Sequence, residues 1–594
     1  MLRIFFLALS LLGFLPLQAQ EDLLARNYMQ QGAYEKAALL YEGLVAKTPG
    51  NTNLVTSLVE AYQQLEQYDK AEKVLLETLE LSKNLVYIKV DLAYNYQLQG
   101  LDAKAQQLYT EVIEQVRANP PLASMVGRTF KKYNLLDEAA TTYTLAKDAG
   151  LNSVYINVEL ARIYGEQGNI EQMFDAYINL ILESDRYQSL AQRAFNDFIT
   201  DDPQNEANGI FRTLLLKRLQ DDPNLLYNRL LSWLFIQQKE YNKAFIQEKA
   251  IARRTNDLNG IFTLASVAKE NEAFELASTI YQYLVEQAPS DEMRLFAHQE
   301  LLDLRVQKND QADFASIEEA YKSLLNQFGT AAETLDLQTK YAHFLAFNQN
   351  KKEEASAFLK ETLNLKLNRF QEARVKMELA DILVLEERFN AALIYYSQIQ
   401  KNLKDNILAQ EARFKVTKTS YYKGDFEWAK TQLKVLKSSA EQLIANDAQD
   451  LYLLITDNTV GDSTQTALKT FAKADLLLFQ NKQDAALEVY NTLLAEHKEK
   501  AIEDETLLEQ AKIFEKKGLY DRAAQNYLLI LERHGDDILA DDAHYRLGNL
   551  YANELEQPEK AKEQYEKIIF NFADSIFYVD AQQKYRKLRG DAIN

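Results

Sequence analysis

Hydrophobic positions along the chain recur with the spacing of an amphipathic helix. In the stretch QGAYEKAALLYEGLVAKTPGN (31–51), apolar and small residues stand at i, i+3, i+4, i+7, i+10 and i+11. They are Tyr34, Ala37, Ala38, Tyr41, Leu44 and Val45. This period places them on one face of an α-helix, so the pattern predicts a helix with one buried stripe. A matching stripe, made of Leu24, Ala25 and Tyr28, predicts another helix just before it.

The residues between and after the two stripes predict where each helix ends. Gly32 stands between the stripes, where a residue with positive φ ends a helix. Pro49 follows the second stripe and stops that helix, and Asn51 can cap the next one. Ala25 and Ala37 are small, which predicts that the two helices approach each other closely. The expected unit of structure is therefore a helical hairpin.

The same pattern returns every 34 residues. Shifting Tyr28 by this period gives an aromatic residue at each step, namely Tyr62, Tyr96, Phe130 and Tyr164. The position of Ala37 becomes Ala71, Ala105, Ala139 and then Met173. The position of Tyr41 becomes Leu75, Tyr109, Tyr143 and Tyr177. A fixed period of this length is typical of repeat architectures in which each repeat is one supersecondary unit.

The small residues, the aromatic residues, Gly32 and Pro49, together with their 34-spaced counterparts, resemble the tetratricopeptide repeat family. The resemblance extends over nearly the whole chain after its first residues. What it implies is an all-α fold, a right-handed superhelical α-solenoid of about 14 to 15 antiparallel helix pairs. The last repeats, with FNFADSIFYVDA at 570–581, are similar to those of bacterial envelope proteins that assemble outer-membrane barrels or coordinate the Tol–Pal system.

Breaks in the pattern divide the chain into expected segments. The stretch TDNTVGDSTQ (456–465) is polar and turn-rich, which favours a hinge or a boundary there. The final helix has a polar face, as the last element of a stack requires. The expected segments are a signal peptide at 1–19, five regular repeats at 20–187, partly divergent repeats at 188–456, a loop or hinge at 457–465, further repeats at 466–575, and a capping helix with a tail at 576–594.

The composition of the chain excludes several classes of binding partner and several types of reactive site. Of the 594 residues, 67 are Lys or Arg and 87 are Asp or Glu, which gives a formal net charge of −20. Phosphate backbones repel such a chain, so nucleic acid is not an expected partner. There is no cysteine, which excludes disulfides, thiolate metal sites, a cysteine nucleophile and a lipid-bearing cysteine.

The first residues have the pattern of a cleaved export signal. Arg3 supplies a positive charge, an apolar run covers 4–17, and Ala19 offers a small residue for cleavage. A membrane anchor is the alternative, but the run is short for a span and no basic cluster follows it. We therefore expect an exported protein without a transmembrane segment after cleavage. A periplasmic location fits best, with a secreted or surface-associated one as alternatives.

Chemical motifs are sparse. The five histidines form no HExxH pair, and no phosphate-binding or nucleophile-elbow motif occurs. The segment HGDDILADDAHY (534–545) has the most metal-like composition. We interpret Asp536 and Asp537 as helix caps, and Asp541, Asp542 and His544 as solvent-facing. No enzyme activity, no cofactor and no metal are expected.

The search for a binding site moves instead to the variable residues between the repeated ones. The family resemblance implies that the first helix of each pair lines a concave surface. The candidate partner-binding residues on these helices are Arg26, Tyr87, Tyr94, Arg128, Lys131, Tyr155, Arg162, Arg229 and Trp233. Arg and aromatic residues anchor many interfaces, so we expect an acidic peptide or a free C-terminus as the ligand. The alternative is that these are ordinary exposed residues, some of them packed between repeats.

These patterns predict an exported, non-enzymatic scaffold or adaptor that binds protein or peptide partners, in envelope assembly, secretion or surface organisation. Two alternatives stay open. One is a glycan- or peptidoglycan-associated binder or enzyme, and the other is a passive structural spacer.

Overall fold

A computed structural model describes residues 17–591, except 83, 152–153, 203, 309–310, 405, 438–441, 460–463 and 499. Every regular element of this described part is helical, which confirms the predicted all-α fold. Most of the predicted signal peptide and the middle of the predicted loop at 457–465 lie outside the described residues. None of the described helices is both long and apolar enough to cross a lipid bilayer.

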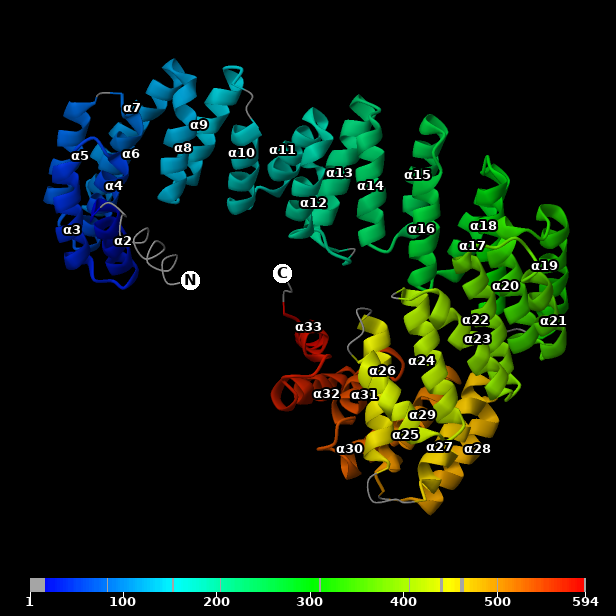
Figure 1. Ribbon diagram of the computed structural model, residues 1–594. Coiled ribbons are helices and arrows are strands. Elements are labelled where there is room, and N and C mark those ends of the chain that lie inside the picture. Colours follow the sequence, from blue (N-terminus) through cyan, green and yellow to red (C-terminus); the bar gives the residue numbers. More distant parts are fainter. Residues whose placement is uncertain are drawn as a thin grey trace, which may run out of the picture. The chain divides into compact units, whose positions relative to one another are not determined.

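The chain divides into two compact units, Met1–Asp257 and Leu258–Asn594. Within each unit, helices that follow one another in sequence lie side by side (Figure 1). The first unit holds α2 (Leu17–Gln30), α3 (Tyr34–Lys47), α4 (Thr52–Gln64), α5 (Tyr68–Leu81), α6 (Val86–Leu98), α7 (Asp102–Ala118), α8 (Ala123–Lys132), α9 (Leu136–Asp148), α10 (Val154–Glu166), α11 (Ile170–Glu183), α12 (Gln188–Asn196), α13 (Glu206–Asp221), α14 (Leu225–Gln237) and α15 (Tyr241–Thr255).

The second unit continues the alternation of first and second helices. It holds α16 (Asn259–Glu270), α17 (Phe274–Gln287), α18 (Asp291–Gln307), α19 (Phe314–Phe328), α20 (Leu335–His343), α21 (Lys352–Thr362), α22 (Arg369–Leu385), α23 (Phe389–Asn402), α24 (Ile407–Tyr422), α25 (Phe426–Leu436), α26 (Gln442–Asp457), α27 (Thr466–Phe479), α28 (Gln483–Glu496), α29 (Ile502–Lys516), α30 (Tyr520–Arg533), α31 (Ala540–Asn553), α32 (Pro558–Asn571) and α33 (Tyr578–Arg589).

The predicted helix ends are confirmed at the first repeats. Gly32 has φ of +72° between α2 and α3, and Asn134 takes the same left-handed conformation, with φ of +56°, between α8 and α9. The Asn51 side chain accepts hydrogen bonds from the backbone N–H groups of Asn53 and Leu54, and so caps α4. These residues turn the chain back on itself, which makes consecutive helices antiparallel.

The core consists of the equivalent positions of successive repeats, which follow the 34-residue period in the first five repeats and a longer spacing later in the chain. Ala25 and Ala37 are fully buried, as their small size predicts. The aromatic position of the second helix is also buried, and it is a tyrosine in most repeats. Fully buried examples are Tyr41, Tyr143, Tyr281, Tyr396, Tyr490, Tyr527 and Tyr565. Each ring fills the space between two helices, and several hydroxyl groups still find a polar partner, such as Asn549 Oδ1 at 2.9 Å from Tyr565 Oη.

Two glycines mark where this tyrosine comes closest to the neighbouring first helix. A Cβ atom on Gly127 of α8 would lie 2.5 Å from Cζ of Tyr143. A Cβ atom on Gly548 of α31 would lie 2.7 Å from Cε1 of Tyr565. Since real Cβ atoms do not approach a ring so closely, glycine is needed at both positions to keep the rings in place.

Two helices depart from the regular pairing. The segment of partly divergent repeats predicted from residue 188 begins with α12, which has only nine residues, followed by α13. After the pair α24 and α25, the chain forms α26 before the next pair begins, so α26 has no partner helix of its own. Ala448 and Ile455 of α26 are buried in one hydrophobic cluster with residues of α24 and α25. The unpaired helix is therefore anchored in the core of its unit.

We predict that Gly127→Ala loosens the α8–α9 pair. The added methyl group pushes the Tyr143 ring out of its place, and overpacking of this kind costs about 1–3 kcal/mol. Hydrogen–deuterium exchange of the full chain should show faster exchange in peptides of α8 and α9, by about tenfold or more.

The matched control is Gly43→Ala in α3, where no atom lies within 4 Å of the added Cβ. Alanine is the better helix former by about 0.5–1 kcal/mol, so exchange in α3 should slow. Equal behaviour of the two variants would contradict the packing role of Gly127.

Candidate functional site

Four of the sequence-predicted site residues come together on α8 and α10. Arg128 Nε donates to the Tyr155 hydroxyl at 3.3 Å. Lys131 Nζ lies 3.2 Å from a carboxylate oxygen of Glu159 and 3.2 Å from one of Glu166. Arg162 Nη1 lies 2.9 Å from Glu159. The cations of this group are therefore already engaged by side chains of the same surface.

The remaining predicted residues make other contacts. Arg26 forms an ion pair with Asp22 in α2, and Arg229 is exposed on α14. Tyr87 is half-buried between two hydrophobic clusters. Trp233 packs against two phenylalanines, Phe195 and Phe211, with ring centroids 6.1 Å and 6.2 Å away.

Tyr94 is held by packing as well. Its ring stacks on that of Tyr133 with the centroids 3.9 Å apart, and Tyr133 donates to Asp91 Oδ1 at 2.6 Å. Burial raises the pKa of Asp91 to about 6, although the bond from Tyr133 opposes the rise. An anion-binding groove in the first unit stays a prediction.

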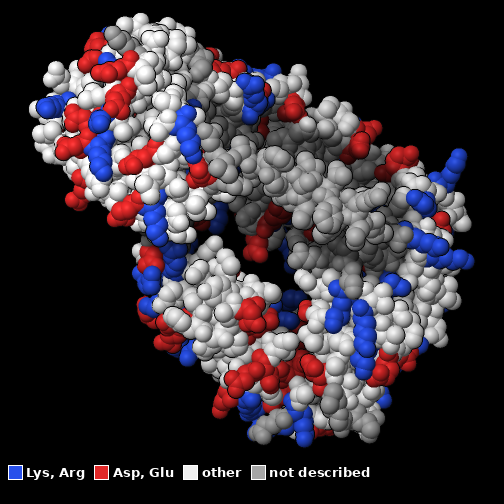
Figure 2. Space-filling view, turned by 60° about the vertical axis from the view of Figure 1, so that its left-hand side comes forward, with Lys and Arg blue, Asp and Glu red and all other residues white. Residues whose placement is uncertain are grey.

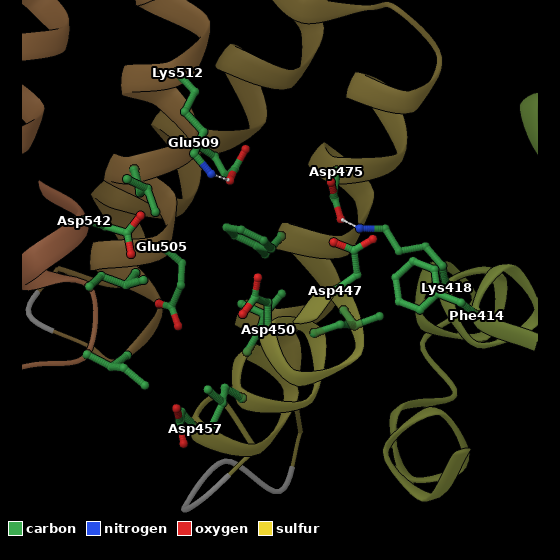
Figure 3. A pocket seen from close by; sticks show the side chains of 17 residues that line it. Phe414, Lys418, Asp447, Asp450, Asp457, Asp475, Glu505, Glu509, Lys512 and Asp542 are labelled. Carbon is green, nitrogen blue, oxygen red and sulfur yellow. Dashed lines mark hydrogen bonds and ion pairs between the residues drawn. The ribbon is translucent and has the colours of Figure 1, made fainter. Parts of the chain in front are cut away.

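A cavity of about 520 Å³ opens in the second unit (Figure 3). Its walls come from α24, α26, α27, α29 and the start of α31. Four of these are first helices of their pairs, and the fifth is the unpaired α26. The cavity therefore lies where the family resemblance places a binding surface, with one added wall.

The floor of the cavity is hydrocarbon. Its apolar lining residues are Phe414, Leu451, Leu453, Leu454, Phe471, Leu508, Ile538 and Leu539. Leu451 and Phe471 are buried and belong to the core of the unit, whereas the Ile538 side chain at the rim is 61% exposed. A partner that covered the rim would remove apolar surface from water.

The walls of the cavity are strongly acidic. Seven carboxylates line it, and they are Asp447, Asp450, Asp457, Asp475, Glu505, Glu509 and Asp542. Two lysines line it as well, and each is already paired. Lys418 Nζ lies 3.0 Å from Asp475, and Lys512 Nζ lies 2.6 Å from Glu509 (Figure 3). On the face shown in Figure 2, acidic and basic side chains are interspersed.

The other carboxylates of the cavity are compensated only in part, because Lys512 opposes the rise in the pKa of Asp450 and of Asp542 without cancelling it. Partial burial, and then the neighbouring Asp447, raise the pKa of Asp450. Burial and then Asp541 raise the pKa of Asp542, whose cation Arg546 is 3.9 Å away. Glu505 accepts a hydrogen bond from Asn458 through Oε1, but its Oε2 atom is buried and has no hydrogen-bond partner among the described residues.

A second cluster surrounds His534 at the end of α30. One ring nitrogen lies 3.0 Å from Asp537 and the other lies 3.2 Å from the buried Glu503, which also pairs with Arg533 at 2.5 Å. Burial disfavours the charged ring, but the two carboxylates outweigh it and raise the pKa of His534. Asp504 also lies close enough to share a metal ion with His534 and Asp537. Because both ring nitrogens are engaged, the arrangement fits a protonated imidazole, whereas a metal ligand must be deprotonated.

The segment 534–545 also corrects two interpretations made from the sequence. Asp537 binds His534 and does not cap α31, which begins at Ala540 with no side-chain cap. Asp541, Asp542 and His544 are all half-buried and not fully solvent-facing. Asp542 lines the cavity, and His544 Nδ1 lies 2.8 Å from Gln564.

The sequence contained one signal of this cavity that the repeat pattern hid. Asp447, Asp450 and Asp457 stand at intervals of three and seven residues, which places them on one face of a helix. Their importance depends on where the unpaired α26 docks, and no periodic pattern encodes that position.

Comparison with known proteins identifies the repeats. Residues 28–87 match the family model described as tetratricopeptide repeat. A TPR repeat-containing protein of Methanocaldococcus jannaschii is 25% identical over 170 residues, which is 28% of this chain. The chain spans 29% of the length of that relative. The chain is therefore similar to tetratricopeptide-repeat proteins in its repeats.

Two solved structures are similar over most of their length, at low identity. One is the APC/C hetero-tetramer Cut9–Hcn1, in which the matched chain is 14% identical with a TM-score of 0.24, covering 97% of this chain and 96% of that chain. The other is Naa15/Naa10 bound to HypK-THB, at 11% identity and a TM-score of 0.27, covering 97% of each chain. Both are distant likenesses.

We predict that His534→Gln lowers the melting temperature of the chain more at pH 5.5 than at pH 8.5. The pKa of His534 is raised in the folded state. Its charge therefore stabilises the fold below the pKa of an unfolded histidine, and this contribution is lost as the pH rises through the folded value.

His298, in the same unit, provides a control of opposite sign. Burial and then Arg294 lower its pKa, so the folded state loses stability as the pH falls. His298→Gln should remove that loss and should gain most at pH 5.5. Thermal melting followed by circular dichroism checks both, and the same pH trend in both variants would contradict the assigned environments.

Proposed function

We propose that this chain, with its tetratricopeptide repeats, is an exported, non-enzymatic scaffold that binds protein partners through the first helices of its helix pairs. The setting that we propose is the bacterial cell envelope, in assembly, secretion or surface organisation. The observation that carries the proposal is the cavity of about 520 Å³ that four first helices and α26 build in the second unit.

The lining of the cavity supports a polypeptide partner. An apolar floor with a charged rim is the usual arrangement of a protein interface, in which a few anchor side chains contribute most of the affinity. The volume suits a few side chains and not a folded domain. A partner would therefore insert part of a segment and rest its remaining surface on the neighbouring helices.

A binding role also fits the chemical groups that the cavity offers. The side chains that line it are carboxylates, lysines and hydrocarbon groups, and its two lysines are held in ion pairs. A nucleophile beside a base, which acyl-transfer chemistry requires, is not part of this described lining. Catalysis by carboxylates on a glycan is the alternative that the experiment below also addresses.

Export is proposed from the sequence. Arg3, the apolar run at 4–17 and Ala19 have the order of a cleaved signal peptide. The described structure begins with α2 at Leu17, so cleavage after Ala19 would leave nearly the whole first helix in place.

We predict that crosslinking in the envelope fraction of a producing bacterium captures a reproducible set of proteins. Ile538→Ser, at the exposed rim of the cavity, should reduce the yield of at least one of them by about tenfold, because burial of such a side chain contributes about 1.5 kcal/mol.

The matched control for this experiment is Ile394→Ser. Ile394 lies on α23 in the same unit and is 59% exposed, close to the 61% of Ile538, but it does not line the cavity. The yield of each captured protein should be the same with Ile394→Ser as with the unchanged chain. Capture of no protein at all would favour the passive spacer, and capture of glycan fragments alone would favour a glycan-associated role.

We predict a separate effect for the double variant Arg128→Glu, Arg162→Glu in the first unit. It breaks the contacts of these cations with Tyr155 and Glu159 and reverses the charge of the predicted groove. A partner with an acidic segment should be lost from the captured set. Retention of every captured protein by this variant would exclude the groove while leaving the cavity of the second unit untouched.

A further inference from the structure

The acidic cavity of the second unit has a charge imbalance that its own lysines do not remove. Lys418 and Lys512 are held by Asp475 and Glu509. The acidic groups that these lysines do not hold are Asp447, Asp450, Asp457, Glu505 and Asp542, and of these Asp542 has a cation, Arg546, at 3.9 Å. We infer that this cavity takes a cationic segment of a partner polypeptide, whose Lys or Arg side chains reach these carboxylates while its apolar side chains lie on the hydrocarbon floor. The inference rests on the proposed function and names the chemistry of the partner.

Charge complementarity is the first argument for this occupant. Asp447 and Asp450 form no ion pair with the described residues, and they stand on one wall of the cavity opposite Glu505 and Asp542 (Figure 3). Like charges that face each other across a partly desolvated space repel, because the effective dielectric constant there is lower than in water. A cation between the two walls would replace this repulsion by attraction, and it would also steer the approach of a cationic partner.

An unpartnered atom is the second argument. Glu505 Oε2 is buried at the cavity and accepts no hydrogen bond from the described residues, although Oε1 is bound to Asn458 at 3.0 Å. Burial, and then the hydrogen bond and the charge of the adjacent Asp504, raise the pKa of Glu505 to about 10, so without a cation beside it this carboxyl is protonated at pH 7. A buried polar atom without a partner costs about 1–3 kcal/mol, and an ammonium or guanidinium group would favour the ionised carboxylate and supply the missing donors.

The spacing of the carboxylates favours an organic cation over a metal ion. Among the described residues, the one group of three potential ligands within 4.8 Å of one another is Asp504, His534 and Asp537. The carboxylates of the cavity are spread further apart. Asp447 and Asp457 are ten residues apart on α26, which corresponds to about 15 Å along a helix. Long side chains with apolar stems and charged ends can span such a distance over a hydrocarbon floor.

The shape of the cavity limits what enters it. A volume of about 520 Å³ accommodates a few side chains. The partner is therefore a segment that places two or three cationic side chains about 10–15 Å apart, which is a spacing of roughly seven to ten residues on a helix. Its apolar residues would cover Leu453, Leu454 and Ile538.

The experiment titrates the full chain with two fluorescein-labelled 14-residue peptides. One carries Arg at positions 2, 5 and 12 among Leu and Ala, and the other carries Glu at the same positions. Fluorescence anisotropy at pH 7 should show binding of the Arg peptide and at least tenfold weaker binding of the Glu peptide. Binding of the Arg peptide should weaken as the salt concentration rises, because salt screens the attraction between charges.

A pair of double variants locates the site. The double variant Asp447→Asn, Asp450→Asn should weaken binding of the Arg peptide at least tenfold. Asp521→Asn, Asp574→Asn removes the same charge from the same unit at positions that do not line the cavity, and it should change the affinity by less than twofold. Because Asp447 and Asp450 hold no ion pair with described residues, their replacement should leave the melting temperature unchanged or slightly higher.

Three results would overturn the inference. The first is equal affinity of the Arg peptide for the two double variants. The second is equal affinity of the unchanged chain for the Arg and Glu peptides. The third is calorimetric binding of CaCl₂ that is lost in Asp447→Asn, Asp450→Asn while the Arg peptide does not bind, which would assign the cavity to a metal ion.

Failure of the inference can be distinguished from failure of the proposed function. If the envelope crosslinking captures partners and Ile538→Ser releases one of them, the scaffold stands even when the Arg peptide fails to bind. If the Arg peptide binds as expected but no protein is captured from the envelope, the chemistry of the cavity stands and the scaffold function falls.

Discussion

The structure depends on one packing contact, in which a buried aromatic ring of the second helix fits against a small residue of the first helix. At Tyr143 and Gly127 the fit leaves no room for a methyl group. This contact sets how closely the helices of a pair approach, and it recurs from repeat to repeat, 34 residues apart at Tyr109 and Tyr143 and 37 and 38 residues apart at Tyr490, Tyr527 and Tyr565. Other features, including the cavity, take their positions from this stack.

The contact also explains how far the sequence could be interpreted. Periodic positions such as Tyr41 and Ala37 predict helices, turns and a core, because each has the same surroundings in every repeat. The structure confirms them. The two-unit division at Asp257 coincides with none of the predicted segment boundaries. The nine predicted groove residues were chosen by type and position, and type does not reveal which cations, such as Lys131, are engaged by neighbouring carboxylates.

The cavity could not be predicted from the repeat pattern, because it depends on contacts that occur only once in the chain. Its acidic wall is formed by α26, a helix without a partner, whose docking position depends on contacts with α24 and α25 that occur once. A single occurrence has no period to detect. The total charge of −20 excluded nucleic acid as an expected partner. It did not reveal the acidic cavity, because Asp450 and Asp542 lie almost one hundred residues apart in the sequence and only the fold brings them to the same cavity. Local charge, and not total charge, is what a binding partner meets.

In the unpaired α26, the residues that face the binding cavity are different from the residues that pack in the core. In a regular helix pair, the residues of a binding surface stand on the same helix as residues whose size is limited by the neighbouring ring, as Gly127 is by Tyr143. Helix α26 presents its carboxylates to the cavity while Ala448 and Ile455 hold it in the core. Substitutions on its exposed face can therefore change the charge of the cavity without altering the buried contacts of the stack. Such a helix is a practical place to engineer binding specificity, because its cavity-facing residues and its buried residues are different ones.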